Sequence, residues 1–256
     1  MVGKLILQGL IAGICAGLLA FGFARVFGEP SVQTAVQFES AQDEARAAAD
    51  RAAGKPAEPE EPEVFSRSVQ SGIGLLTGVV VVGAGLGALF AVLFAFANGR
   101  IGSFGPGATC ALLALLGWLS VYLVPALKYP ANPPAVGEPD TIRIRTALYF
   151  LMMAASIAST IGAWALGRLI ARRHGPWNGC VGALLAYLAV LTVVFQVLPP
   201  INEVPGNFPA VTLWNFRVAS AGLQVVLWGG VGLIFGTMVE MRQAAPGAGE
   251  AGLRTQ

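Results

Sequence analysis

Two proline-rich connectors hold most of the residues in this sequence that could bind a polar solute. They cover residues 128–141 (KYPANPPAVGEPDT) and 202–210 (NEVPGNFPA), and each lies between long apolar segments. Proline has no backbone N–H and restricts the residue before it, so these connectors are expected to be irregular and stiff, with exposed carbonyl oxygens. The polar side chains in them, with one arginine just beyond, are Lys128, Asn132, Glu138, Asp140, Asn202, Glu203 and Arg217.

The oxygen atoms of these connectors suggest a site for a divalent cation. Carboxylate, amide and backbone carbonyl oxygens are ligands that such ions accept. We take Glu203, Asn202 and Asn132 as candidate metal ligands. Glu138 and Asp140 would add negative charge that attracts the ion.

Arg217 is the charged residue nearest to the second connector, at the start of the last apolar segment. We expect it to hold a carboxylate, with Glu203 the closest candidate in sequence, and to release that group when an ion binds. The alternative is that the connectors are only ordered turns, in which proline ends one helix and Asp140-Thr141 caps the next.

Composition predicts a membrane protein. Of 256 residues, 55% are hydrophobic and 12% are charged, and the mean hydropathy is +0.67. Soluble domains carry about 25% charged residues. A net charge of +2, without a basic stripe, excludes nucleic acid as a partner and leaves the lipid bilayer.

Six apolar segments are long enough to cross a bilayer, which needs about 20 residues per helix. We therefore predict an all-α fold, a polytopic membrane helix bundle of about six transmembrane helices over residues 1–242. The expected spans are 5–27, 72–97, 107–127, 146–170, 179–198 and 217–240.

One long polar stretch, residues 29–71, interrupts this pattern and is rich in Ala, Glu and Pro. Its part 38–53 has a helix-forming composition. Its part 54–63 contains Pro56, Pro59 and Pro62, and is expected to be an extended linker. Residues 243–256 read as a disordered tail.

The basic residues bear on the orientation in two ways. A raw Lys/Arg count slightly favours the side of the connectors as cytoplasmic, whereas the density of basic residues is higher on the side of the termini. Six spans put both termini on one side, and the two connectors share the other side. Arg168, Arg172 and Arg173 cluster at a membrane end on the side of the termini. Positive residues mark the cytoplasmic side, so we expect both termini in the cytoplasm.

Three glutamines within or beside the spans, Gln70, Gln196 and Gln224, could line a path through the bundle. An unsatisfied amide in lipid costs several kcal/mol, so their side chains are expected to point inward. Hydrogen bonding between helices is the alternative role. At the end of the first span, Arg25 and Glu29 are four residues apart and could pair.

No motif in the sequence indicates catalysis. The single histidine, His174, lies in a basic loop, and there is no metalloprotease motif, phosphate-binding loop or nucleophile beside a base. We therefore expect no enzyme, no permanently bound cofactor and no self-contained ATP-driven pump.

Four segments resemble the CbtA family of predicted cobalt transporter subunits. They are GLLAFGFARVFGEP (17–30), SRSVQSGIGLLTG (66–78), VPALKYPANPPAVGEPDTIRIRTALY (124–149) and residues 202–228, which begin NEVPGNFPA. The resemblance covers nearly the whole chain. It implies a multi-pass protein of the bacterial inner membrane, Co²⁺ or another divalent cation as substrate, and a small single-span companion subunit, CbtB, as partner.

The chain departs from this family between the first two spans, where members often carry a histidine-rich stretch. Here that stretch has no histidine. Its acidic AEPEEPE segment would concentrate cations without selecting among them.

The sequence as a whole favours a membrane transport protein, specifically a divalent metal cation (cobalt) permease subunit. The alternative is a non-transporting membrane scaffold or assembly subunit.

Overall fold

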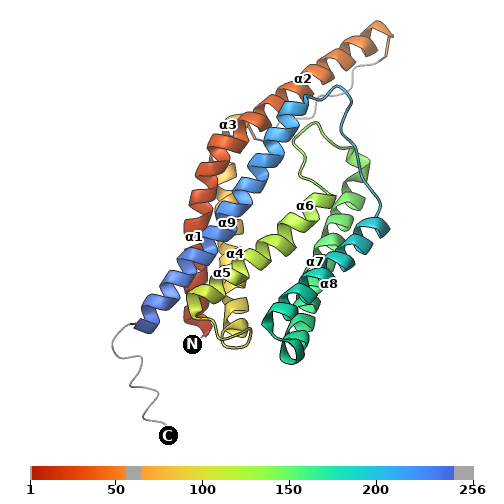
Figure 1. The fold of residues 1–256 in the computed structure, drawn as a ribbon. Helices are drawn as coiled ribbons and strands as arrows, with labels where there is room; N and C mark the ends of the chain where they lie inside the picture. The colour runs from red at the N-terminus through yellow and green to blue at the C-terminus, as the bar shows by residue number, and fades with distance from the viewer. Residues whose placement is uncertain (1, 56–64, 245–256) are drawn as a thin grey trace. The chain divides into compact units, whose positions relative to one another are not determined.

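The computed structural model describes residues 2–55 and 65–244. Six of its helices are long and apolar enough to cross a membrane: Val2–Ala52, Arg67–Ala97, Pro106–Lys128, Pro139–His174, Pro176–Val197 and Ala210–Arg242. The described residues form no strands (Figure 1). The prediction of an all-α polytopic membrane bundle with about six spans is confirmed.

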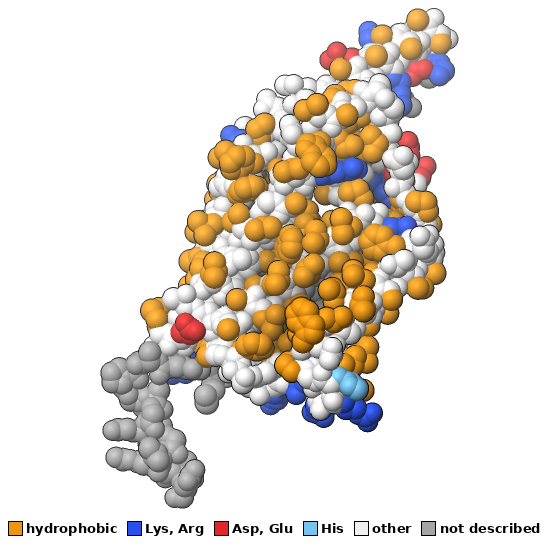
Figure 2. Space-filling model, in the orientation of Figure 1, with side chains coloured by type: hydrophobic (Ala, Val, Ile, Leu, Met, Phe, Trp, Pro, Cys, Tyr) orange, Lys and Arg blue, Asp and Glu red, His pale blue; other side chains and the backbone are white. Residues whose placement is uncertain are grey.

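The chain divides into two compact units. The first unit comprises Met1–Leu115 and Val218–Gln256, and the second unit comprises Leu116–Arg217. Large apolar side chains are widely exposed on both, as Figure 2 shows for one face; Leu89, Phe96 and Val197 are each at least 71% exposed. Soluble monomers rarely expose such extensive apolar surface, whereas lipid accepts it.

The first unit is built around two long helices. One consists of α1 (Val2–Phe23), the π-helical turn η1 (Ala24–Gly28) and α2 (Glu29–Ala52). The other consists of α3 (Arg67–Val69), η2 (Gln70–Gly74) and α4 (Leu75–Ala97). Thus residues 29–52 of the polar stretch are helical and continue α1.

Glycines set the distance between α1 and α4. A Cβ atom at Gly9 would overlap the carbonyl oxygen of Gly87, and one at Gly13 would overlap that of Gly83. In lipid, helices associate by close van der Waals packing, and small residues allow it. The glycine spacing in the first span therefore reflects helix contact.

Two further helices contribute to the first unit, α5 (Pro106–Gly117) and the part of α9 (Ala210–Ala244) that follows Arg217. Phe235 is fully buried and packs edge-on against Phe90 and Phe94, with ring centroids 5.7 and 5.4 Å away. The backbone N–H of Gly107 donates to Glu240 Oε1 (3.1 Å), which satisfies a free donor at the start of α5.

The polar stretch differs from the sequence-based expectation in the partner of Glu29. The nearly buried Glu29 accepts a hydrogen bond from Arg67, not from the expected Arg25, because the chain returns to the start of α3 beside α2. Most of the expected linker 54–63 and of the expected tail 243–256 lies outside the described residues. Gln243 and Ala244 belong to α9.

The second unit contains η3 (Trp118–Leu123), α6 (Val124–Lys128), the 3₁₀ turn η4 (Pro139–Thr141), α7 (Ile142–His174) and α8 (Pro176–Val197). α7 and α8 form an antiparallel pair joined at Gly175 (φ +86°), a backbone conformation that favours glycine. A buried cluster joins them to α6: Val124, Tyr129, Leu148, Met152 and Leu191. This core supports the connectors at one end of the unit.

The glycine contact in the first unit can be tested by substitution. Gly13→Val places a branched side chain against the backbone of α4 and should lower stability by about 1–3 kcal/mol, the usual cost of overpacking. Gly22→Val is the matched control on the same helix, because no atom lies within 4 Å of a Cβ there. Thermal unfolding in detergent should separate the two variants; equal unfolding temperatures would contradict the close contact.

Candidate solute-binding site

The first connector follows α6 and is irregular for the reason that the sequence suggests. Pro130, Pro133 and Pro134 exclude a continued helix, and the backbone turns at Ala135 (φ +65°) and Gly137 (φ +121°). A non-glycine residue in the left-handed region is uncommon, and such strain concentrates at functional sites.

The N-terminus of α7 lacks the side-chain cap that Asp140-Thr141 could provide. Thr141 is the N-cap residue of α7, but no side chain forms a capping hydrogen bond there. The Thr141 hydroxyl instead donates back to the carbonyl oxygen of Glu138 (2.8 Å), and the Asp140 side chain is exposed. The Thr141 hydroxyl therefore stabilises the connector and does not cap the helix.

Three hydrogen bonds join the first connector region to the end of α8 and the second connector. Lys128 Nζ donates to the carbonyl oxygen of Phe195 (2.8 Å). The Tyr129 hydroxyl donates to that of Pro199 (2.8 Å), and the N–H of Glu138 donates to Glu203 Oε2 (2.9 Å). The two connectors thus meet at one end of the second unit, as their position in the sequence predicts.

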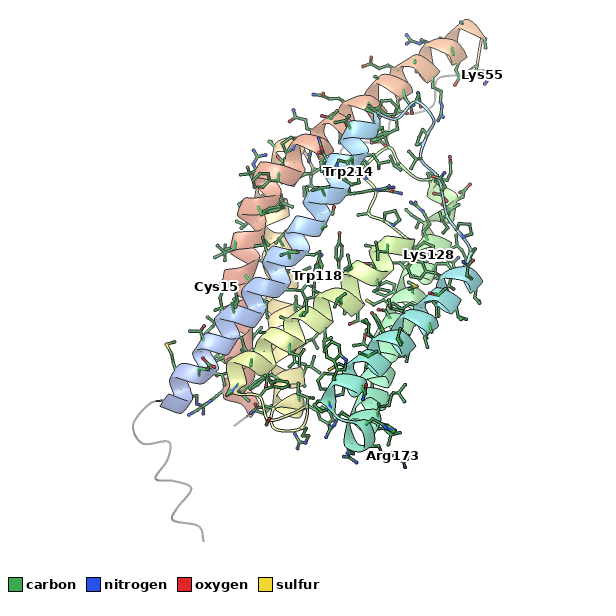
Figure 3. The ribbon with its side chains drawn as sticks, in the orientation of Figure 1. Cys15, Lys55, Trp118, Lys128, Arg173 and Trp214 are labelled. Atoms are coloured by element: carbon green, nitrogen blue, oxygen red, sulfur yellow. The ribbon has the colours of Figure 1, made fainter. Side chains whose placement is uncertain are left out.

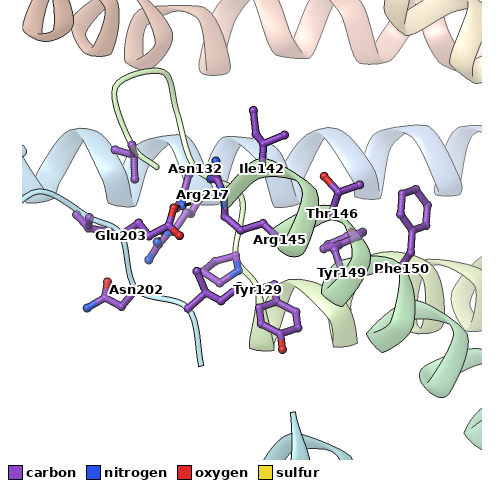
Figure 4. A pocket seen from close by; sticks show the side chains of 14 residues that line it. Tyr129, Asn132, Ile142, Arg145, Thr146, Tyr149, Phe150, Asn202, Glu203 and Arg217 are labelled. Carbon is purple, nitrogen blue, oxygen red and sulfur yellow. Dashed lines mark hydrogen bonds and ion pairs between the residues drawn. The ribbon is translucent and has the colours of Figure 1, made fainter. Parts of the chain in front are cut away.

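A pocket of about 350 Å³ lies where the connectors meet, within the second unit (Figure 4). Four of the predicted site residues line it: Asn132, Asn202, Glu203 and Arg217. The start of α7 adds Arg145, Thr146, Tyr149 and Phe150, and the first connector adds Tyr129. Charged and amide groups gather at one end, and Tyr149 and Phe150 lie farther along α7.

Glu203 is the only carboxylate in the pocket lining, and it is paired with Arg145. Arg145 Nε lies 3.3 Å from Glu203 Oε2, and the two side chains are 25% and 15% exposed. Arg145 Nη2 also donates to the carbonyl oxygen of Glu138 (3.2 Å). One arginine therefore bridges both connectors.

The surroundings of Glu203 favour its ionised form. The hydrogen bond from the N–H of Glu138 is the main cause that lowers its pKa below the ordinary 4.5. The nearby Thr141 hydroxyl lowers the pKa further, desolvation opposes these two effects, and the charge of Arg145 adds the smallest lowering effect.

Arg217 does not hold Glu203, which corrects the prediction from sequence. Its Nη2 donates to Asn132 Oδ1 (2.9 Å), and its Nε donates to the carbonyl oxygen of Ala131 (3.3 Å). Arg145 takes the predicted role because it stands one turn inside α7, directly beside the connector. Helical spacing places Arg145, Leu148, Tyr149 and Met152 on one face, and this signal could have identified it.

The other predicted residues lie apart from this pocket. Glu138 and Asp140 are in the connector, but their side chains are exposed and do not line it. Gln196 is exposed on α8, and Gln70 and Gln224 belong to the first unit. Gln70 is also exposed and donates to the carbonyl oxygen of Phe65 (2.9 Å).

The donor set of the pocket is made of oxygen atoms. Within residues 2–55 and 65–244, no three His, Cys, Asp or Glu side chains are grouped as a metal site would need. Glu203, Asn132 and Asn202 can offer one carboxylate and two amide oxygens. Such a set binds divalent cations weakly and with little selectivity.

The family comparison decides the class of protein. A family described as "Probable cobalt transporter subunit (CbtA)" matches residues 2–240. The chain belongs to the CbtA family. It is thus a multi-pass membrane protein of a family of probable cobalt transporter subunits, as its six spanning helices also indicate.

The CbtA match includes both connectors and every residue of the pocket. No curated protein and no solved structure matches the chain significantly. The roles of single residues therefore rest on the geometry of this structure.

The lowered pKa of Glu203 predicts how the connectors respond to acid. Ionised Glu203 stabilises the fold above pH 4.5, and this contribution should disappear as the pH falls through its lower folded-state pKa. Glu203→Gln should therefore lower the unfolding temperature at neutral pH, and the difference from wild type should vanish in acid. Glu44→Gln, at an exposed site on α2, is the control; a pH-independent difference for Glu203→Gln would contradict the assignment.

Gly137 should be sensitive to the smallest side chain. At φ +121° an alanine is strained, and its Cβ would overlap Nη1 of Arg145. Gly137→Ala should cost about 1–3 kcal/mol of stability and move Arg145 away from Glu203. Gly206→Ala in the second connector has open space and is the control. Unfolding temperatures in detergent provide the measurement, and an unperturbed Gly137→Ala variant would show that the connector adapts freely.

Proposed function

We propose that the pocket of the second unit is the site where this CbtA-family protein binds Co²⁺ before moving it across the membrane. The observation that carries the proposal is the Arg145–Glu203 pair, which lines the pocket where the two stiff connectors meet. Glu203 stays ionised at neutral pH because its pKa is lowered. It can therefore exchange its arginine partner for a metal cation.

The exchange needs a pair that is weak enough to open. Both side chains remain partly accessible to water, which can solvate the two charges when the pair opens. After Arg145 withdraws, Glu203 provides the charged ligand, and the amide oxygens of Asn132 and Asn202 complete an oxygen set with water. Weak binding suits transport, because the ion must also leave.

The exposed carboxylates of Glu138 and Asp140 would act earlier, by raising the local concentration of cations at the mouth of the pocket. The structure supports this role only by their place in the connector. Their substitution should change the rate of ion capture and its dependence on salt more than the affinity.

The orientation of the pocket follows from α7. The pocket lies at the start of this 33-residue helix, and Arg172 and Arg173 lie in its last turn (Figure 3). If these arginines mark the cytoplasmic side, the pocket opens to the outside of the cell. We therefore place the protein in the bacterial inner membrane, with both termini in the cytoplasm and the pocket positioned for uptake.

The family description names a subunit, so a partner belongs to the functional unit. We propose that this partner is a small single-span companion of the CbtB type. Transport should therefore be measured with and without it.

The test is uptake of radioactive Co²⁺ into vesicles that contain the purified protein. The double variant Glu203→Gln/Asn132→Ala should lower the initial rate about tenfold or more at limiting Co²⁺, the effect of losing about 1.4 kcal/mol of binding. Glu44→Gln controls for the loss of one carboxylate. Unchanged uptake by the double variant would contradict these roles, as would a loss of stability without any change in metal dependence.

A further inference from the structure

The charges in the pocket do not balance. Its lining contains two guanidinium groups, Arg145 and Arg217, but only the carboxylate of Glu203. The carboxylates of Glu138 and Asp140 are exposed to water and lie outside the lining. At rest the side chains of the pocket therefore carry a net charge of +1.

Of the two pocket arginines, Arg217 has no charged partner among the described residues. Its recorded bonds go to a backbone carbonyl oxygen and to an amide oxygen, both neutral. A guanidinium has five N–H donors, and no bond is seen from Nη1 of Arg217 to any described residue. This group is partly withdrawn from water, which makes an acidic partner favourable.

Arg145 also has hydrogen-bonding capacity that its recorded contacts do not use. Its buried Nε lies within ion-pair distance of Glu203 but forms no hydrogen bond of good geometry. Buried donors are normally satisfied, so the contact with Glu203 leaves part of the hydrogen-bonding capacity of this guanidinium unused. Arg145 also loses its counter-charge when Glu203 turns to a cation.

Binding of a bare divalent cation would therefore increase the imbalance. The ion and the pocket side chains would together carry +3, with both guanidinium groups unneutralised and close to the metal. Like charges in a partly desolvated site repel strongly. A negatively charged group that contacts the arginines would remove this cost.

The pocket has room for such a group. A cation with six waters occupies about 180 Å³, taking about 30 Å³ for each water. The cavity of about 350 Å³ leaves a similar volume free. Guanidinium groups bind carboxylates with two parallel hydrogen bonds, which fits two arginines at one end of the cavity.

We infer that the pocket binds its cation together with a small carboxylate anion, which lies against Arg145 and Arg217. This inference rests on the proposed function and specifies its substrate: a divalent cation with a di- or tricarboxylate, bound as a chelate or as two separate ions. Linkage requires each ion to raise the affinity for the other by the same factor.

The experiment measures binding of radioactive Co²⁺ to the purified full chain in detergent, at matched free Co²⁺, in chloride, succinate or citrate. The apparent Kd should fall about tenfold in carboxylate. A fall with both anions indicates separate ions, because succinate chelates weakly, and a fall with citrate alone indicates a chelate. Phosphate is the control anion, and an effect of phosphate alone would overturn the assignment to a carboxylate.

Arg217→Gln should abolish the effect of the anion, whereas Arg143→Gln, at an exposed site outside the pocket on the same helix as Arg145, should keep it. If Arg217→Gln does not fold, Arg217→Lys keeps the charge without the paired donors and should reduce the effect. Equal Co²⁺ affinity in chloride and in carboxylate would overturn this inference and leave the proposed function intact. Absence of Co²⁺ binding under every condition would overturn both.

Discussion

The carboxylate of Glu203 is the contact on which the organisation of the pocket depends. It accepts the backbone N–H of Glu138 and faces Arg145, so one side chain joins the second connector to the first connector and to the start of α7. The prolines around it prevent either connector from forming a regular helix. Lys128 and Tyr129 add hydrogen bonds from the first connector to the chain at the end of α8.

This arrangement combines a stiff frame with one exchangeable interaction. The walls of the pocket are held by the prolines of the connectors, by the positive φ angle of Ala135 and by the buried cluster that includes Tyr129. The Arg145–Glu203 pair, in contrast, joins two side chains that are partly exposed to water, so Glu203 can exchange its partner. A transport site needs both properties, because it must first bind the ion at a defined position and then release it.

The apolar pattern predicted the fold well, because a membrane helix needs a long hydrophobic segment whatever its partners are. The even number of spans between the connectors also predicted that both lie on the same side of the membrane, where they can meet. The partner of Glu203 did not follow, because Arg217 is closer in sequence but Arg145 is closer in space. Distance along the sequence does not reveal that the first turn of α7 brings Arg145 next to Glu203 in the second connector.

The glutamines show a similar limit. A polar residue in an apolar span suggests an inward position, but Gln196 lies exposed near the end of α8, where interfacial water can satisfy its amide. The helix α2 also begins earlier than the helix-forming composition of residues 38–53 suggests, at Glu29, where it continues α1.

The central claim is that Glu203 exchanges Arg145 for the metal ion, and X-ray absorption spectroscopy at the cobalt edge tests it most directly. The purified protein with bound Co²⁺ should show a first shell made of oxygen atoms, including a carboxylate signature that Glu203→Gln removes. Nitrogen or sulfur ligands, or a spectrum unchanged in Glu203→Gln, would contradict the account.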